Sequence, residues 1–339
     1  MKKAVIILDG LGDVRYKNLG NKTPFEYAKT PNLDYLAKNG VKGFMQPIKN
    51  VAPESGDSQF AILTGSLNNV PSRGILEAID AGIKLKKGEC ALRCNFAKIK
   101  GDKIIKVRID IPSKNELNKL NKIDKDIRII PTIGYRGVII VKNSKGRIEN
   151  THPGYKRYKN ISMAIDPIMK LKSSKNKKMD NFLREVKKIL KNKTLLLRGF
   201  GCNIPKIKKM SNWSLLADMP VEIGLGKVLG MKILDKKNEI KKIINAKSNI
   251  YVQIKGPDTY GHRGDLKGKI RAIEKIDRML KPLTKLKNTL ICITSDHATP
   301  CKLKRHSKDL VPLIIYNGVK KGKIKTIYGK DLMKILNRF

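Results

Sequence analysis

Three short apolar runs in this chain each lead to an aspartate, and this pattern restricts the possible folds more than any other feature. The runs and the aspartates that follow them are 3–8 with Asp9, 250–255 with Asp258, and 289–295 with Asp296. Short, mostly apolar runs bounded by loop residues are typical of strands buried on both faces, as in parallel sheets. Because the carboxyl ends of parallel strands meet at one edge of a sheet, we expect the three aspartates to converge there.

Segments with helical spacing separate these runs. The sequence after Thr30 predicts a helix with Pro31 at its first position and Gly40 at its end. Another helix is expected to begin near Ser58. A further strand and two further helical segments are expected at 195–198, 214–230 and 267–286. The alternation predicts an α/β fold, with a three-layer core around a mainly parallel sheet.

The middle of the chain has a different pattern. Its hydrophobic pieces are short and are separated by stretches rich in Lys and Asn, and a lysine-rich helix is expected over 178–191. We therefore predict a smaller inserted α+β domain at 98–192. The core domain is then discontinuous and comprises 1–97 and 193–339.

The formal charge of +44, from 73 Lys and Arg against 29 Asp and Glu, is extreme. The lysines are spread along the whole chain, interleaved aromatics are scarce, and no helix-turn-helix, zinc-finger or RNP-type motif is present. A general lysine bias therefore explains the charge better than a dedicated nucleic-acid surface, and we predict no specific nucleic-acid partner. A positive field would also attract an anionic substrate.

The sequence favours a cytoplasmic protein without membrane association. No run approaches the roughly 20 apolar residues of a membrane span, and the apolar run at the N-terminus is too short for a signal peptide. The five cysteines are an odd number without a repeated pair spacing, which predicts reduced thiols that mostly fill the core.

Three of the four histidines lie within 45 residues near the C-terminus, each close to an aspartate. A single Asp-His pair is usually ordinary surface polarity, but the joint occurrence at strand ends favours a site for two divalent cations, which accept imidazole nitrogen and carboxylate oxygen. The candidate ligands are Asp9, Asp258, His262, Asp296, His297 and His306. The remaining histidine, His152, lies in an expected turn of the middle segment, where a solvated loop residue is as common as a ligand contact.

Two nearby metals can hold a phosphoryl group, but such a site also needs a nucleophile. The Pro/Gly-containing segment 51–58 supplies Ser55 and Ser58 just before an expected helix, whose N-terminus favours a phosphoserine. A serine hydroxyl needs a base or a metal to activate it. The residues alone leave both serines open.

Taken together, these segments resemble the archaeal-type cofactor-independent phosphoglycerate mutases of the alkaline phosphatase superfamily. The resemblance covers both ends of the chain in the same order, and it is weak in the middle. The segments that carry it are 7–13, 21–34, 52–55, 72–78, 92–97, 196–201, 257–262, 296–301 and 306–313.

The resemblance implies an isomerase of glycolysis and gluconeogenesis that interconverts 3-phosphoglycerate and 2-phosphoglycerate without 2,3-bisphosphoglycerate. It implies that Ser55 is the nucleophile and forms a phosphoserine, while glycerate turns over in the closed site. It also implies two divalent metals, manganese or zinc, with magnesium and cobalt as alternatives. One metal would be bound by Asp9, Ser55, Asp296 and His297, and the other by Asp258, His262 and His306.

Arginines are suited to the substrate's carboxylate and phosphate, because the planar guanidinium donates two hydrogen bonds to such anions. Our candidates are Arg73, Arg93, Arg198, His152 and Arg157. For each of these arginines, a role as a surface or ion-pair residue is as common as a role in substrate binding. Closure of the inserted domain as a lid would keep water from the phosphoserine.

The sequence departs from the family at the nucleophile. Gly56 separates Ser55 from Asp57, and an ungapped alignment on Pro53 and Gly65 puts Gly56 itself at the nucleophile position of some members. Ser58 is therefore kept as the alternative. Two other functions stay open: a metal-dependent phosphatase or mutase for another phosphorylated small molecule, and a basic nucleic-acid-binding protein that has lost catalysis. The oligomeric state is open as well.

Overall fold

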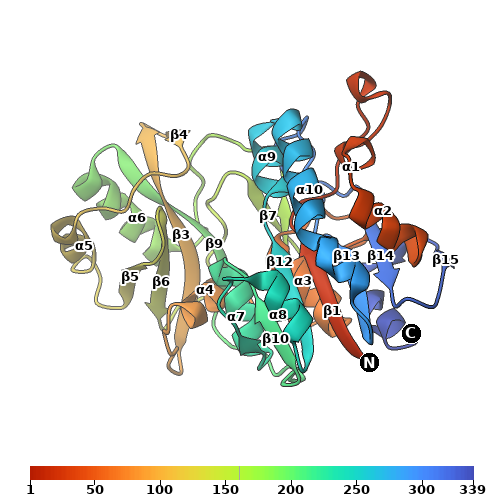
Figure 1. Cartoon of the computed structure of the whole chain (residues 1–339). Coiled ribbons are helices and arrows are strands. Elements are labelled where there is room, and N and C mark those ends of the chain that lie inside the picture. Colours follow the sequence, from red (N-terminus) through yellow and green to blue (C-terminus); the bar gives the residue numbers. More distant parts are fainter. Residues whose placement is uncertain (160) are drawn as a thin grey trace. The chain divides into compact units, whose positions relative to one another are not determined.

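The computed structural model describes residues 1–159 and 161–339 (Figure 1). The chain forms two compact units, of which the first is discontinuous and comprises 1–68 and 208–339, while the second comprises 69–207. The second unit is longer at both ends than the insertion expected at 98–192. The reason is that the strands at either end of that segment pair with each other.

In the described part of the first unit, nine strands form one sheet in the order β11-β10-β12-β1-β13-β14-β2-β15, with β16 also paired to β2. They are β1 (Lys2–Leu8), β2 (Val41–Gln46), β10 (Trp213–Leu216), β11 (Lys232–Ile233), β12 (Asn249–Ile254), β13 (Thr289–Thr294), β14 (Val311–Tyr316), β15 (Gly322–Lys323) and β16 (Ile327–Tyr328). β1 is parallel to both neighbours, β12 and β13, and only the pairs of β14 are antiparallel. The prediction of a mainly parallel sheet is confirmed.

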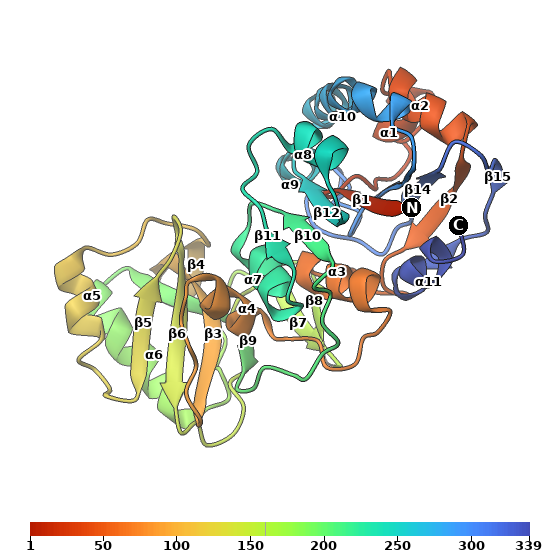
Figure 2. The ribbon, with the colours of Figure 1, turned by 60° about the horizontal axis from the view of Figure 1, so that its bottom comes forward.

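Helices cover both faces of this sheet. They are α1 (Pro24–Tyr27), α2 (Pro31–Lys38), α3 (Ser55–Thr64), α7 (Pro220–Val228), α8 (Glu239–Asn245), α9 (Pro257–Arg263), α10 (Leu266–Leu280) and α11 (Leu332–Leu336), with 3-10 turns η1 (Lys17–Leu19), η2 (Lys281–Lys285) and η3 (Gly329–Asp331). α1 and α2 pack on α10, whereas α7 and α11 pack on α3. Figure 2 shows α2 and α10 on one side of the sheet and α3 and α11 on the other. The three-layer core is therefore confirmed.

The core explains why the central strands are apolar on both faces. Ile6 and Leu8 of β1 pack in a cluster with Leu33 of α2 and Ile276 of α10. The alternate residue Ile7, which points to the other face, is equally buried. A strand covered by helices on both sides has no solvent-facing positions, so its sequence shows an unbroken apolar run.

The second unit is an antiparallel sheet with helices on both faces. In its described residues, the five strands of the sheet are β3 (Glu89–Lys100), β4 (Lys103–Lys106), β5 (Ile127–Pro131), β6 (Arg136–Lys142) and β9 (Lys193–Gly201). A separate two-stranded sheet consists of β7 (Tyr155–Tyr158) and β8 (Ile161–Ala164). The expected α+β organisation is confirmed. The helices are α4 (Arg73–Asp80), α5 (Lys114–Leu120) and α6 (Lys177–Leu190). Leu92 and Phe96 of β3 pack in a cluster with α6, and the alternate residue Ala91 packs with α4.

Two expected elements differ from the structure. α3 begins at Ser55 and not near Ser58, so the serines lie inside the helix. The segment 214–230 contains the strand β10 and the helix α7, because Pro220 starts a helix after a short buried run. Helical spacing cannot be distinguished from a buried strand over so few residues.

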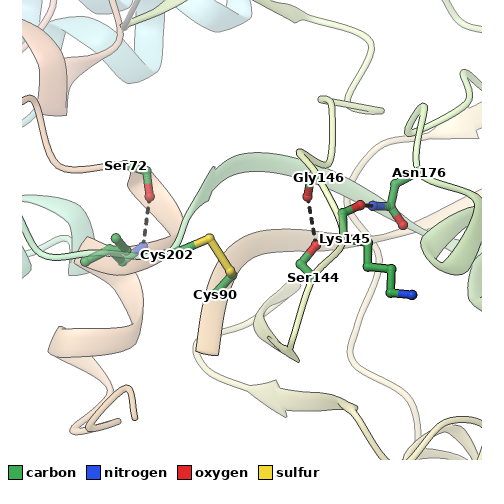
Figure 3. The surroundings of a disulfide bond; sticks show 8 residues. Ser72, Cys90, Ser144, Lys145, Gly146, Asn176 and Cys202 are labelled. Atoms are coloured by element: carbon green, nitrogen blue, oxygen red, sulfur yellow. Dashed lines mark hydrogen bonds between the residues drawn. A yellow bond between two sulfur atoms is a disulfide. The ribbon is translucent and has the colours of Figure 1, made fainter. Parts of the chain in front are cut away.

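The expectation of reduced cysteines is wrong for one pair. Cys90 of β3 and Cys202, just after β9, form a disulfide within the second unit (Figure 3). The other three cysteines, Cys94, Cys292 and Cys301, are free and buried. In the described parts of the chain, we find no helix with the length and apolar character that a membrane crossing requires.

Candidate functional site

The register of the sheet brings the three aspartates together, as predicted. Leu8 of β1 pairs with Ile254 of β12, and Ile7 pairs with Thr294 of β13, so the three strands end at the same level. The segment after each strand carries one aspartate: Asp9 after β1, Asp258 in the first turn of α9, and Asp296 after β13. All of the candidate metal ligands lie in the first unit.

One group of ligand atoms surrounds His297. Its Nε2 lies 3.3 Å from Asp9 Oδ1, 3.7 Å from Asp296 Oδ2 and 3.1 Å from Ser55 Oγ. Asp9, Asp296 and His297 are almost fully buried, with at most 1% of each exposed. The ligand atoms of these three residues all lie within 4.8 Å of one another, a spacing that one metal ion can bridge.

A second group surrounds Asp258. Its Oδ1 lies 3.5 Å from His262 Nε2 and 3.7 Å from His306 Nε2. The rings of His297 and His306 stack at 3.6 Å between centroids, so the two groups are adjacent. The structure therefore brings together all seven predicted metal-site residues.

The hydrogen bonds of the three histidines prepare each of them for a metal. His262 Nδ1 lies 2.9 Å from Lys304 O, and His306 Nδ1 lies 2.7 Å from Pro53 O. Thr299 Oγ1 donates to Asp258 and is therefore an acceptor for His297 Nδ1, 3.0 Å away. Because a carbonyl or hydroxyl acceptor holds a proton on Nδ1, Nε2 is the nitrogen that faces the site, and it carries the lone pair when the ring is neutral.

The carboxylates also fit a metal. Asp9 Oδ1 and Asp296 Oδ1 are buried and receive no hydrogen bond from the described residues. A buried carboxylate oxygen without a donor is costly. Oxygen and imidazole ligands at this spacing are suited to zinc, manganese and similar divalent ions, so the donor set fits the metals that the sequence predicts.

The ionisation of these groups reflects their burial and their mutual charges. Burial, partly offset by His297, raises the pKa of Asp296 to about 6. Burial alone would lower the pKa of His297, but the surrounding carboxylates raise it to about 9. Burial and the adjacent His297 lower the pKa of His306 to about 3. Burial opposes ionisation of Asp9, but Lys255 and His297 hold the pKa of Asp9 well below its usual range.

The two serines differ in where their hydroxyls point. Ser55 is half-buried at the first position of α3, with its hydroxyl at His297. Ser58 is fully buried, and its hydroxyl donates to the backbone oxygens of Glu54 and Ser55. Gly56 lies between them in the first helical turn and offers no side chain. The structure thus places the hydroxyl of Ser55, and not that of Ser58, at the candidate metal ligands.

Two residues of the site were missed in the sequence. Lys255, the last residue of the apolar run before Asp258, donates to Asp9 Oδ2. Gln59 of α3 donates to Asp296 Oδ2 at 2.9 Å. The position of Lys255 directly after a buried strand could have indicated its role in the site. The role of Gln59 could not have been predicted, because its position in the site depends on the helix starting at Ser55.

The second unit holds a buried cluster of arginines around one carboxylate. Arg73 of α4 donates from Nε to Glu77 Oε1 at 2.7 Å, and Arg93 Nε of β3 lies 3.5 Å from the same oxygen. Arg198 of β9 is the register partner of Arg93, and Arg136 of β6 is the partner of Asn95. The charges of all four arginines lower the pKa of the buried Glu77 against the effect of burial.

This cluster contains three of the predicted substrate residues and adds Arg136 and Glu77, which were missed. Arg93 Nη1 and Arg136 Nη1 are buried and donate to none of the described residues. The charges of four guanidinium groups thus act on the carboxylate of Glu77. Buried guanidinium groups with unused donors, such as those of Arg93 and Arg136, suit a ligand that carries more than one negative charge.

The other two predicted substrate residues differ from each other. His152 is buried, with its Nε2 3.3 Å from Asn95 Nδ2 and its ring beside Tyr155, whose ring also receives Arg198. His152 is therefore not a solvated loop residue. Arg157 is exposed on the hairpin strand β7, where its Nε donates to Lys159 O, and the structure does not bring it into the arginine cluster.

Comparison with known proteins identifies relatives over the whole chain. The family model of the metalloenzyme superfamily matches residues 1–337 of this chain. A probable 2,3-bisphosphoglycerate-independent phosphoglycerate mutase of Thermosipho africanus is 30% identical, over 98% of this chain and 92% of that protein. The 2,3-bisphosphoglycerate-independent phosphoglycerate mutase 1 of Archaeoglobus fulgidus is also 30% identical, over 99% of this chain and 97% of that protein.

Solved structures agree with this fold. The PH0037 protein of Pyrococcus horikoshii superimposes with a TM-score of 0.75 at 24% identity and covers 99% of this chain and 96% of that one. The cofactor-independent phosphoglycerate mutase of Thermoplasma acidophilum superimposes with a TM-score of 0.61 at 23% identity, over 100% and 99% of the two chains. The resemblance deduced from the motifs is therefore confirmed.

Proposed function

Since this chain belongs to the metalloenzyme superfamily and to the family of 2,3-bisphosphoglycerate-independent phosphoglycerate mutases, we propose that its metal centre interconverts 3-phosphoglycerate and 2-phosphoglycerate through a phosphoserine at Ser55. The observation that carries the proposal is the position of the Ser55 hydroxyl, 3.1 Å from a histidine nitrogen whose other ring nitrogen is already engaged. Ser55 is the one serine of the segment 51–58 with its hydroxyl in the site.

We assign Asp9, Ser55, Asp296 and His297 to one divalent metal and Asp258, His262 and His306 to the other. When bound, the metals supply Lewis-acid stabilisation of the serine oxygen and of the phosphoryl oxygens. Manganese and zinc are our candidates, with magnesium and cobalt as alternatives, because this donor set accepts several divalent ions. Lys255 holds one oxygen of Asp9, and the other oxygen faces His297, where it would be available to a metal.

The chemistry at Ser55 is two successive phosphoryl transfers. The Ser55 oxygen attacks the phosphorus of 3-phosphoglycerate, the bond from phosphorus to the 3-oxygen breaks, and that oxygen takes up the proton that Ser55 released. The glycerate then presents its 2-hydroxyl, whose oxygen attacks the phosphorus of the phosphoserine. The bond from phosphorus to the Ser55 oxygen breaks, and the proton of the 2-hydroxyl passes to that oxygen, which restores Ser55. The N-terminus of α3, a ten-residue helix, directs its backbone N–H groups toward the phosphate on Ser55.

We propose that the arginine cluster of the second unit binds the carboxylate and the phosphate of the substrate through Arg73, Arg93, Arg136 and Arg198. The unused donors of Arg93 and Arg136 support this role. Retention of glycerate between the two transfers is essential, because a water molecule that reached the phosphoserine would release phosphate. A lid role for the second unit and a cytoplasmic location, where glycolytic intermediates are found, belong to the same proposal.

The test is one assay of the metal-loaded protein with 3-phosphoglycerate that measures 2-phosphoglycerate and free phosphate in parallel, with Ser55→Ala and Ser58→Ala as variants. We expect 2-phosphoglycerate from the wild type and from Ser58→Ala, and a loss of at least about a thousandfold in Ser55→Ala. Free phosphate as the main product would identify a phosphatase. If Ser55→Ala kept its activity, the phosphoserine at this residue would be wrong.

A further inference from the structure

Lys269 of α10 is a fully buried lysine close to the metal centre that takes no part in the chemistry above. None of it is exposed, and its Nζ donates to three oxygens: Asp13 Oδ2 at 2.8 Å, Thr299 O at 2.9 Å and Gly12 O at 3.0 Å. Nζ of a lysine has three protons. All three are therefore used, and the ion pair with Asp13 is closed to water on both sides.

The three acceptors lie on the two loops that carry metal ligands. Gly12 and Asp13 follow Asp9 on the loop after β1, and Thr299 follows His297 on the loop after β13. The loops are also joined directly, since Thr299 N donates to Gly12 O at 3.0 Å and Cys301 N donates to Asp13 Oδ2 at 3.2 Å. One ammonium group thus sits at the junction of both loops.

Thr299 connects this junction to the ligands themselves. Its backbone oxygen accepts from Lys269, while its hydroxyl donates to Asp258 at 2.7 Å and faces His297 Nδ1. The packing leaves little freedom, because a Cβ on Gly261 would lie 2.3 Å from Thr299 O and a Cβ on Gly12 would lie 2.6 Å from the Cβ of Ala298. A shift of Thr299 would therefore change the orientations of the Asp258 and His297 side chains.

From this geometry we propose that Lys269, with Asp13, is a positioning pair that fixes the two ligand-bearing loops relative to each other and so sets the affinity of the metal centre. The inference rests on the proposed metal site. Stability alone is a poor explanation, since a buried ion pair can often be replaced by apolar residues of similar size at no loss. Outer groups that orient metal ligands typically change metal affinity by about 10- to 100-fold.

The experiment measures Co²⁺ binding to the metal-free full-length protein by its visible absorption, together with the thermal unfolding midpoint. Lys269→Met leaves Asp13 buried without its cation, so this variant loses both stability and affinity. The double variant Lys269→Met/Asp13→Asn removes the unpaired charge, and we expect it to recover most of the stability but to bind Co²⁺ at least about tenfold more weakly than the wild type. Lys275→Met, an exposed position on the same helix, is the control for the substitution.

A second control separates positioning from general loss of stability. Asp277, also buried on α10, accepts from the backbone N of Asn32 and Leu33 at the start of α2, and among the described residues its side chain has no hydrogen bond to either metal loop. Asp277→Asn is expected to lower the unfolding midpoint while Co²⁺ affinity and spectrum stay as in the wild type.

The outcomes are distinct. Weakened Co²⁺ binding in the double variant, with wild-type Co²⁺ affinity in both control variants, supports the positioning pair. Wild-type affinity and spectrum in the double variant would overturn it and leave Lys269 a structural residue. If the wild type binds Co²⁺ but does not form 2-phosphoglycerate, the proposed function fails and the comparison of the variants still decides on Lys269. If the wild type binds no Co²⁺, the metal centre and the positioning pair are both wrong.

Discussion

Glu77 provides the sharpest test of the arginine cluster, because the charges of four guanidinium groups act on its buried carboxylate. The substitution Glu77→Gln keeps the shape of the side chain and removes its charge. Arg73 is only 14% exposed, and Arg93 is 2% exposed. Neither guanidinium can therefore regain the interaction with water.

The expected magnitude follows from this burial. At an effective dielectric constant near 20, a pair of unit charges about 4 Å apart attracts by about 4 kcal/mol, an attraction that desolvation offsets in part. Removal of one partner from a buried network typically costs about 3–5 kcal/mol, because the remaining charge stays buried. For a protein of this size, such a loss lowers the unfolding midpoint on the order of 10 °C.

The assay is urea unfolding of wild type and Glu77→Gln near neutral pH, with Asp102→Asn as the matched control. Asp102 pairs with Lys187 at 3.3 Å but is 71% exposed, so its loss should change the free energy of unfolding by less than about 0.5 kcal/mol. A loss below about 1 kcal/mol in Glu77→Gln would refute the argument that this carboxylate compensates the buried arginines.

The pH dependence gives a second check on the same residue. The folded pKa of Glu77 is depressed below its ordinary value of 4.5, so its contribution is fully present above pH 4.5 and is lost as the pH falls through the folded pKa. The difference between wild type and Glu77→Gln should therefore stay constant between pH 6 and 8 and shrink below about 4.5. A difference that grew on acidification would contradict the sign of this shift.

Three further changes have defined outcomes. Thr299→Val removes the hydroxyl that bonds to Asp258 and faces His297, and calorimetry should show metal affinity reduced by about 10- to 100-fold. Lys255→Met leaves Asp9 without its cation, and we expect the rate of the mutase assay to fall by about 100-fold or more while Lys275→Met has no effect. Cys90→Ser opens the disulfide to Cys202, and urea unfolding should show a loss of about 2–5 kcal/mol that a reducing agent reproduces in the wild type.

The sequence was sufficient for the core and for the convergence of the candidate metal ligands, because both are encoded locally. A strand buried on both faces has an unbroken apolar run, and parallel strands bring the residues after such runs to one edge. Asp9 and Asp296 could therefore be placed without knowing the strand order. The histidines follow in the same loops, so their approach to the aspartates is largely a consequence of the same topology.

The arginine cluster was only partly predictable, because it depends on pairing between distant strands. Arg136 joins the cluster through β6, next to β3, and a change of register by one residue would turn it to the other face. Glu77 belongs to it because α4 covers that face of the sheet. The bounds of the second unit depend on the same kind of pairing, since β3 and β9 pair across more than 90 intervening residues.

The choice between Ser55 and Ser58 shows where a small structural difference decides the chemistry. With a helix start near Ser58, both serines would lie before or at the helix N-terminus, and either hydroxyl could reach a phosphoryl group. Because α3 begins at Ser55, Ser58 falls one turn further along, where its hydroxyl bonds to backbone oxygens of the preceding turn. Of the two serines, Ser55 alone then combines the open end of the helix with the approach to His297, so Gly56 separates Ser55 from Asp57 without displacing the proposed nucleophile.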